Sequence, residues 1–223
     1  MNQIALLANG EILSHPTPIH ALQTANSIVC CDGAINKLRP EWIAPDCSEI
    51  FIVGDGDSWG KKNTIQDLFH NVQLHFVHIS EQDDNDLTKA FHFILQHFDL
   101  QQIKCITLLG TTGLRDDHSL ANISLLGLYY KELITLHHTS ITLTMPTNYG
   151  IFTPVFGQAT LQSHPGQQVS LFSLTPNTPI TVKRLKYPIE HRQLTMLWQG
   201  SLNEAINDDF EVSGGLLLIY QAF

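Results

Sequence analysis

The chain lacks several features that would place it in a common class of protein. No apolar run approaches the roughly 20 residues that a membrane-spanning helix needs, and the first ten residues have neither the basic segment nor the apolar length of a signal peptide. Basic residues are few: 12 Lys and Arg stand against 21 Asp and Glu, for a formal charge of −9. Because an acidic chain repels a polyphosphate backbone, we expect no nucleic-acid partner. From the lack of a signal peptide and of a membrane-spanning run, we expect a cytoplasmic protein that does not bind membranes.

Cysteine is also scarce, and its spacing argues against a disulfide or zinc framework. The four cysteines are Cys30, Cys31, Cys47 and Cys105, with no Cys-x-x-Cys pair among them. Two are adjacent in the apolar run Ser27–Cys31, which is typical of a buried strand. We therefore expect reduced thiols in the core.

The first two-thirds of the chain alternates strand-like and helix-like patterns. With 223 residues, of which 43% are hydrophobic, the chain is long enough for one large or two small globular domains. Thr17-Pro18 is typical of a helix start, and apolar residues at helical spacing predict helices from about Asp84 to Phe98 and from about Asp117 to Leu133. The expected strands are Ile4–Ala8, Ser27–Cys31, Ile50–Val53, Leu74–Ile79 and Ile103–Leu109.

After about His138 the pattern changes to short strands separated by prolines, with no convincing helix. The expected strands are Ile141–Met145, Gln168–Leu174, Ile180–Leu185, Leu194–Trp198 and Gly215–Tyr220, and Pro146, Pro154, Pro165, Pro176, Pro179 and Pro188 fall at what we interpret as turns. The sequence therefore predicts an α/β domain with a mostly parallel, Rossmann-like sheet over residues 1–138. A small all-β sandwich is expected over residues 139–223.

Acidic residues follow several of the predicted strands. Ligands of an open parallel sheet bind at the carboxyl ends of its strands. Here these ends lead to Asn9-Gly10, Asp32-Gly33, Gly54-Asp-Gly-Asp-Ser58, Glu81-Gln-Asp-Asp-Asn-Asp86 and Gly110-Thr-Thr-Gly-Leu-Arg-Asp-Asp-His118. Each cluster alone is equally typical of a turn or of a helix N-terminus. Three clusters at successive strand ends would repel one another unless a cation lay among them, which favours a functional site.

The chemistry expected at such a site is the binding of a divalent cation and a phosphorylated substrate. Carboxylate oxygens suit Mg²⁺ or Ca²⁺, and Mg²⁺ in proteins usually shares one or two carboxylates with substrate phosphates. Asp83 and Asp86 lie at a predicted helix start with Lys89 one turn on, and the Gly110–Gly113 loop precedes another helix, where backbone N–H groups can bind phosphate. His118 and Asn122 lie one turn apart beside Asp117.

Four stretches resemble, in order, the motifs of the thiamine pyrophosphokinase family. Cys31-Asp-Gly-Ala-Ile-Asn-Lys-Leu38 resembles Ala-Asp-Gly-Gly-Ala-Asn-x-Leu, and Gly54-Asp-Gly-Asp-Ser58 resembles Gly-Asp-Phe-Asp-Ser. Gln82-Asp-Asp-Asn-Asp-Leu-Thr-Lys-Ala90 is similar to Asp-x-Thr-Asp-x-x-Lys-Ala, and Gly110-Thr-Thr-Gly-Leu-Arg-Asp-Asp-His118 to Gly-x-x-Gly-Gly-Arg-x-Asp-His, with Asn122 following. In the second half, Arg184-Leu-Lys-Tyr-Pro188 and Gly200-Ser-Leu-Asn-Glu204 resemble the segments Gly-Leu-Lys-Tyr-Pro and Gly-Thr-Ser-Asn-Glu.

The resemblance implies an α/β catalytic domain, a C-terminal β-sandwich and a homodimer whose active sites lie between subunits. It implies Mg²⁺-dependent transfer of pyrophosphate from ATP to thiamine, which yields thiamine diphosphate and AMP. Asp55, Asp57, Asp86 and Asp117 would bind Mg²⁺ and, with Arg115, carry catalysis. The residues expected to bind the substrates are Asn9, Asp32, Asn36, Ser58, Gln82, Asp83, Lys89, Gly110, Gly113, His118, Asn122, Ser201 and Asn203.

One departure from the family pattern bears on thiamine binding. Leu202 stands where the family has a serine that helps hold the thiamine pyrimidine, and an apolar side chain cannot replace that hydrogen bond. Two other functions remain open. The Asp-x-Asp sequence also fits a nucleotide-sugar transferase, and Leu202 fits a non-catalytic sensor of thiamine or nucleotide.

Overall fold

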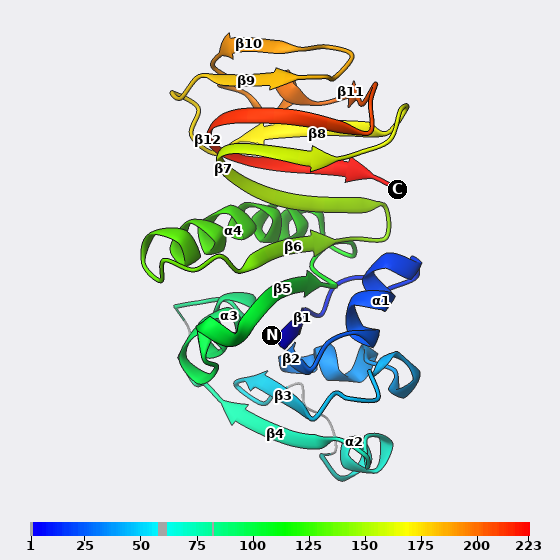
Figure 1. Ribbon diagram of the computed structural model, residues 1–223. Helices are drawn as coiled ribbons and strands as arrows, with labels where there is room; N and C mark the ends of the chain where they lie inside the picture. The colour runs from blue at the N-terminus through cyan, green and yellow to red at the C-terminus, as the bar shows by residue number, and fades with distance from the viewer. Residues whose placement is uncertain (1, 58–61, 82) are drawn as a thin grey trace.

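The computed structural model describes residues 2–57, 62–81 and 83–223, and its first half is built on a parallel sheet (Figure 1). Six strands pair in the order β6-β5-β1-β2-β3-β4. Their bounds are β1 Asn2–Leu7, β2 Ser27–Cys31, β3 Glu49–Gly54, β4 Gln73–His78, β5 Ile103–Leu109 and β6 Thr142–Pro146. The helices are α1 Pro16–Gln23, α2 Lys62–Leu68, α3 Asp86–His97 and α4 Asp116–Thr135.

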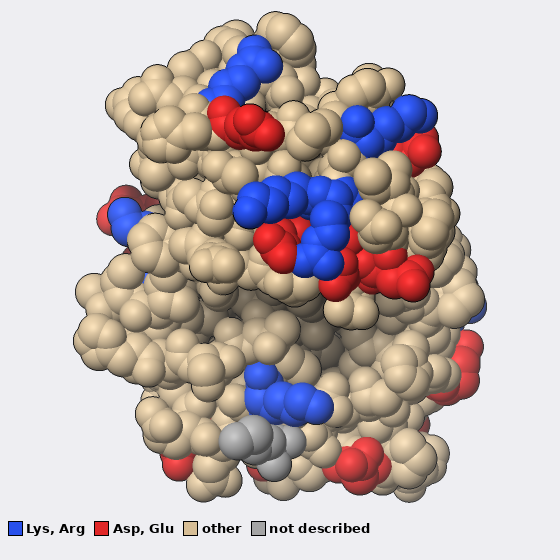
Figure 2. Space-filling view, turned by 45° about the horizontal axis from the view of Figure 1, so that its top comes forward, with Lys and Arg blue, Asp and Glu red and all other residues tan. Residues whose placement is uncertain are grey.

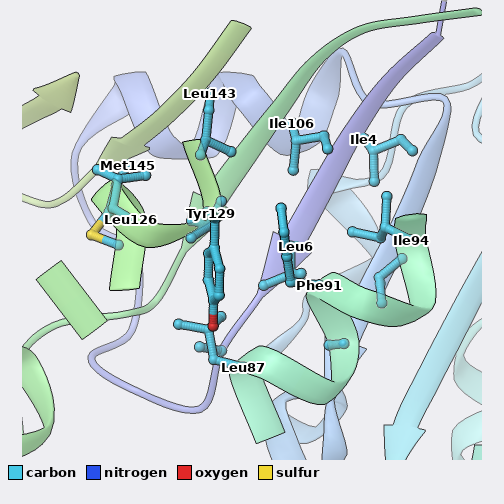
Figure 3. Close-up of a cluster of buried hydrophobic side chains, with 14 of the residues drawn as sticks. Ile4, Leu6, Leu87, Phe91, Ile94, Ile106, Leu126, Tyr129, Leu143 and Met145 are labelled. Carbon is cyan, nitrogen blue, oxygen red and sulfur yellow. The ribbon is translucent and has the colours of Figure 1, made fainter. Parts of the chain in front are cut away.

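Helices cover both faces of this sheet, which explains why its inner strands are mainly apolar. Successive residues of β1 alternate between two cores. Ile4 and Leu6 pack in one cluster with Phe91 of α3 and Tyr129 of α4, and Figure 3 shows these side chains facing one another. Ala5 and Leu7 belong to the second cluster, on the face of α1 and α2.

The second half is β-rich and extends the sheet. Its strands are β7 Gly150–Gln162, β8 Gln168–Ser173, β9 Ile180–Lys183, β10 Ile189–Arg192, β11 Asn203–Glu204 and β12 Asp209–Ala222. The long strand β12 pairs with β7 along its length, with β8 near its end and with β9 near its start. A third core cluster, which includes Val155, Leu171, Val182 and Phe210, lies within this unit.

The predicted fold class is confirmed, but the strands of its second half differ from those predicted. The strands β7, β10 and β11 were not predicted. Leu194–Trp198 was expected to be a strand, but residues 194–196 are irregular and Leu197–Gly200 form a 3₁₀ turn. Pro154, expected at a turn, lies inside β7 and pairs with Leu218 of β12. The predicted strand Ile141–Met145 corresponds to β6, which pairs in parallel with β5 although it follows residue 138. The division into domains at residue 138 stays a prediction.

The expectation of free thiols in the core is confirmed for three of the four cysteines, and Cys105 is partly buried. All four cysteines are free, and Cys30, Cys31 and Cys47 are buried. Burial raises the pKa of the Cys47 thiol to about 11, so that it stays protonated near neutral pH. Within the part of the chain that the structure describes, no helix is long and apolar enough to cross a membrane.

Leu202 adopts a backbone conformation that favours glycine. Its φ is 59° and its side chain is 81% exposed. A left-handed conformation costs an L-residue roughly 1–2 kcal/mol, and glycine avoids this cost. Glycine loses more conformational entropy on folding, which offsets part of the gain. Leu202→Gly is therefore expected to raise the free energy of unfolding by about 0.5–1 kcal/mol, measured by urea denaturation.

The matched control for that prediction is Ile206→Gly. Ile206 is also exposed, at 50%, but does not have a positive φ. Its replacement is expected to lower stability. A fall in stability in both variants would contradict the assignment of backbone strain to Leu202.

Candidate active site

The strand ends form a cavity of about 690 Å³ at the point where the order of the sheet reverses. From β1 the chain moves outward through β2, β3 and β4, and then crosses back to place β5 on the other side of β1. Ligands of open α/β sheets bind at such a switch point. The loops after β1 and β5 are joined by backbone hydrogen bonds, from Gly10 N to Gly110 O at 2.7 Å and from Glu11 N to Thr112 O at 2.8 Å.

Many of the residues predicted from the sequence line this cavity. They are Asn9, Asp32, Asp55, Asp57, Asp86, Gly110, Gly113, Arg115, Asp117, His118 and Asn122. Their segments are far apart along the chain, and the strand order brings them together. On the face of the molecule shown in Figure 2, which is hollowed, Lys and Arg side chains lie beside Asp and Glu instead of forming one basic patch.

Three carboxylates meet at the ends of β2 and β3. Asp32, Asp55 and Asp57 each offer one oxygen, and these oxygens lie within 4.8 Å of one another. Asp32 is 6% exposed and follows β2 directly. Gly54, at the end of β3, leaves room for it, because a Cβ there would lie 2.7 Å from the Cβ of Asp32.

The chemistry of this donor set fits a hard divalent cation. The three side chains supply oxygen donors only, which Mg²⁺ prefers, and their mutual repulsion falls when a cation binds. The sequence predicted Asp55 and Asp57 as ligands but placed Asp32 among the substrate-binding residues. Among the described residues, neither Asp86 nor Asp117 belongs to this three-carboxylate group.

Asp86 lines the same cavity from the first turn of α3. The N-cap of this helix is Asn85, whose Oδ1 accepts from Thr88 N at 2.8 Å. Burial raises the pKa of the Asp86 carboxyl; the nearby Lys89 opposes this rise, and Asp55 and Asp57 add to it. Lys89 Nζ lies 3.8 Å from Asp86 Oδ1. It is 5% exposed and does not line the cavity, so it acts on the site through Asp86.

Arg115 and Asp117 form a two-pronged ion pair at the start of α4. Arg115 Nη2 donates to Asp117 Oδ2 at 2.6 Å, and Nε donates to Oδ1 at 3.1 Å. This pairing lowers the pKa of Asp117 to about 2. Asn122 Nδ2 donates to Thr111 O at 2.7 Å and fixes the preceding loop to the helix.

The remaining predicted residues lie elsewhere or outside the described residues. Ser58 and Gln82 fall outside them. The cavity lining does not include Asn36, Asp83, Lys89, Ser201 or Asn203. Asn203 is buried, and its amide is used within the β-rich unit: Oδ1 accepts from Tyr187 N at 3.1 Å, and Nδ2 donates to Tyr187 O at 2.7 Å.

The residues missed from the sequence include Lys37, which supports a loop of the site without lining the cavity, and Thr111, which lines it. Lys37 Nζ donates to the carbonyl of Asn9 at 2.8 Å and also to that of Gly10, and thereby supports the loop after β1. It occupies the variable position of its motif, so no sequence signal identified it. Thr111 lines the cavity, and although its loop was singled out, its side chain was not.

Comparisons with known proteins match the two halves of the chain to two family models. Residues 19–137 match the model described as "Thiamin pyrophosphokinase, catalytic domain". Residues 150–220 match "Thiamin pyrophosphokinase, substrate-binding domain". No curated protein matches the chain by sequence.

Solved structures show the same fold at low sequence identity. Thiamin pyrophosphokinase from Candida albicans superposes with a TM-score of 0.78 at 18% identity, over 99% of this chain and 88% of that one. The thiamine pyrophosphokinase from Bacillus subtilis superposes with a TM-score of 0.72 at 21% identity, over 98% of each chain. The yeast thiamin pyrophosphokinase superposes with a TM-score of 0.72 at 15% identity, over 100% of this chain and 87% of that one.

Proposed function

The chain belongs to the thiamin pyrophosphokinase family, and from this premise we propose that it transfers the β,γ-pyrophosphoryl group of ATP to the hydroxyethyl oxygen of thiamine. AMP is the second product. The observation that carries the proposal is the meeting of Asp32, Asp55 and Asp57 within 4.8 Å at the switch point of the sheet.

Asp32, Asp55 and Asp57 would hold Mg²⁺ in this proposal. When bound, Mg²⁺ neutralises charge on the transferred phosphoryl oxygens and on the leaving group. The contribution of the protein is then mainly positioning, because the transition state of phosphoryl transfer is loose. The fixed carboxylates at two neighbouring strand ends supply that positioning. Their negative charge also favours the cationic thiazolium ring of thiamine.

Asp86 is the best candidate for accepting the proton of the thiamine hydroxyl. A general base works best with a pKa near the operating pH, and burial raises the pKa of Asp86. Asp117, with a pKa of about 2, is a poor base. We assign Asp117 to the orientation of Arg115, whose guanidinium would contact substrate phosphate.

Thiamine binding by Ser201 requires a second copy of the chain in this proposal. Ser201 lies outside the cavity lining of a single chain, so a homodimer with shared sites would have to bring it there. Asn203 also lies outside the lining, and because its amide is bonded to Tyr187 it would support this segment without contacting thiamine. Sedimentation velocity is expected to show twice the 25.0 kDa mass of one chain. A monomer that is fully active would exclude this part of the proposal.

We also propose that the protein is located in the cytoplasm, which cell fractionation tests.

Product analysis tests the reaction directly. The purified protein is incubated with Mg²⁺, ATP and thiamine, and the products are separated by chromatography. We expect AMP and thiamine diphosphate in equal amounts. ADP with thiamine monophosphate would overturn the pyrophosphoryl transfer. Binding of both substrates by calorimetry without any product would favour the sensor, and thiamine-independent cleavage of a nucleotide sugar would favour the transferase.

A further inference from the structure

Thr111 lines the cavity, and its buried hydroxyl has no hydrogen-bond partner among the described residues. The residue lies two positions after β5 and is 3% exposed, and it lines the cavity. Within the described residues, no group forms a hydrogen bond with its Oγ1. Buried polar groups are nearly always hydrogen-bonded, so an exception at the wall of a cavity calls for a partner that the cavity would supply.

The backbone around Thr111 is held firmly, so its hydroxyl has a defined position. Its carbonyl accepts from Asn122 Nδ2 at 2.7 Å. Gly110, with φ of 59°, makes the turn out of β5; a Cβ there would lie 2.5 Å from the carbonyl oxygen of Ala8. The loops after β1 and β5 therefore fix Thr111 from both sides.

The surroundings of this hydroxyl favour an anionic acceptor. The loop leads into the N-terminus of the 20-residue helix α4, whose N-cap residue Arg115 makes no side-chain cap hydrogen bond. The free N–H groups of a helix N-terminus attract anions, and Arg115 lines the same cavity. Asp32, Asp55 and Asp57 also line this cavity. A phosphate group near Thr111 would therefore belong to a polyphosphate that extends from Thr111 toward a cation at these carboxylates.

We propose that Thr111 contacts the substrate, its hydroxyl donating a hydrogen bond to a phosphate oxygen of the nucleotide. The inference rests on the proposed function for the identity of the nucleotide. It adds a residue at a variable position of the family motif, which the sequence did not assign to binding. Valine has nearly the shape of threonine but no hydroxyl, so Thr111→Val isolates this one contact.

The test is calorimetry in the presence of Mg²⁺ with two probes. One is α,β-methylene ATP, in which the bond that would be cleaved is blocked, and the other is adenosine, which has no phosphate. Thr111→Val is expected to weaken binding of α,β-methylene ATP about 10-fold and to leave adenosine binding unchanged. Thr111→Ser, which keeps the hydroxyl, is expected to bind both probes like the wild type.

Thr112→Val is the matched control, because Thr112 lies in the same loop but does not line the cavity. It is expected to bind both probes normally. Without ligand, Thr111→Val should be at least as stable as the wild type in urea, since no protein hydrogen bond is lost. Unchanged binding of α,β-methylene ATP, or an equal loss for adenosine, would overturn the proposal.

The two proposals fail in different ways. A wild type that binds α,β-methylene ATP but forms no thiamine diphosphate refutes the proposed reaction, while Thr111→Val still tests the contact. A wild type with full activity whose Thr111→Val variant binds the nucleotide equally well refutes the contact alone. A wild type that binds no nucleotide overturns both.

Discussion

Asp57→Asn is expected to lower kcat/KM for thiamine diphosphate formation by at least about 1000-fold. Asp57 supplies one of the three carboxylate oxygens that lie within 4.8 Å of one another. Asparagine keeps the shape of the side chain but removes the negative charge on which cation binding depends. The measurement is the initial rate of AMP and thiamine diphosphate formation at saturating Mg²⁺.

The same substitution should leave the fold intact. Removing one of several neighbouring carboxylates relieves their repulsion, so the metal-free variant should be at least as stable as the metal-free wild type. Added Mg²⁺ should raise the melting temperature of the wild type and not that of the variant. Asp208→Asn, an equal change at an exposed position of the β-rich unit, is the control and should behave like the wild type. Near-normal turnover of Asp57→Asn would refute the ligand assignment.

Lys89→Met is expected to have the next largest effect, a loss of about 10- to 100-fold in kcat/KM at neutral pH. Lys89 is 5% exposed, and its Nζ lies 3.8 Å from Asp86 Oδ1. Methionine fills a similar volume without the charge, so the packing of α3 changes little. Because Lys89 does not line the cavity, its effect on the reaction would pass through Asp86.

The pH profile distinguishes this positioning role from a loss of structure. Burial already raises the pKa of Asp86, and Lys89 opposes that rise. Without the ammonium group the pKa rises further, so a higher pH is needed to ionise the carboxyl. The rising limb of the activity profile should therefore move to higher pH, and the loss should shrink as pH increases. Lys104→Met, at an exposed position of β5, is the control; a loss that is equal at every pH would contradict the role of Lys89.

The parallel half of the fold could be predicted because its signals are local. Ser27–Cys31 and Ile103–Leu109 were predicted with the bounds that the structure has. In the β-rich half the same reasoning failed where breaker residues lie inside strands. β7 contains Pro154, which was expected at a turn, and also Gly157. Its pairing with the distant β12 holds this strand together.

The candidate site was predictable as far as strand ends determine it. Asp55, Asp57 and Asp86 follow from the rule that ligands bind at carboxyl ends, and all three line the cavity. The place of Asp32 in the carboxylate group depends on the pairing of β2 with β3 and on the space that Gly54 leaves. The role of Lys37 depends on two contacts with the distant loop after β1, which no periodicity or motif encodes. The proposed role of Thr111 depends on a buried hydroxyl without a partner among the described residues, which only the folded structure shows.

The central claim is that the carboxylates at the ends of β2 and β3 hold the divalent cation. A titration with Mn²⁺, followed by electron paramagnetic resonance of the free ion, tests it most directly on the wild type, Asp57→Asn and Asp208→Asn. We predict that the wild type and Asp208→Asn each bind one Mn²⁺ per chain in the presence of α,β-methylene ATP, and that Asp57→Asn loses this binding. Equal binding of Mn²⁺ by Asp57→Asn and the wild type would contradict the claim.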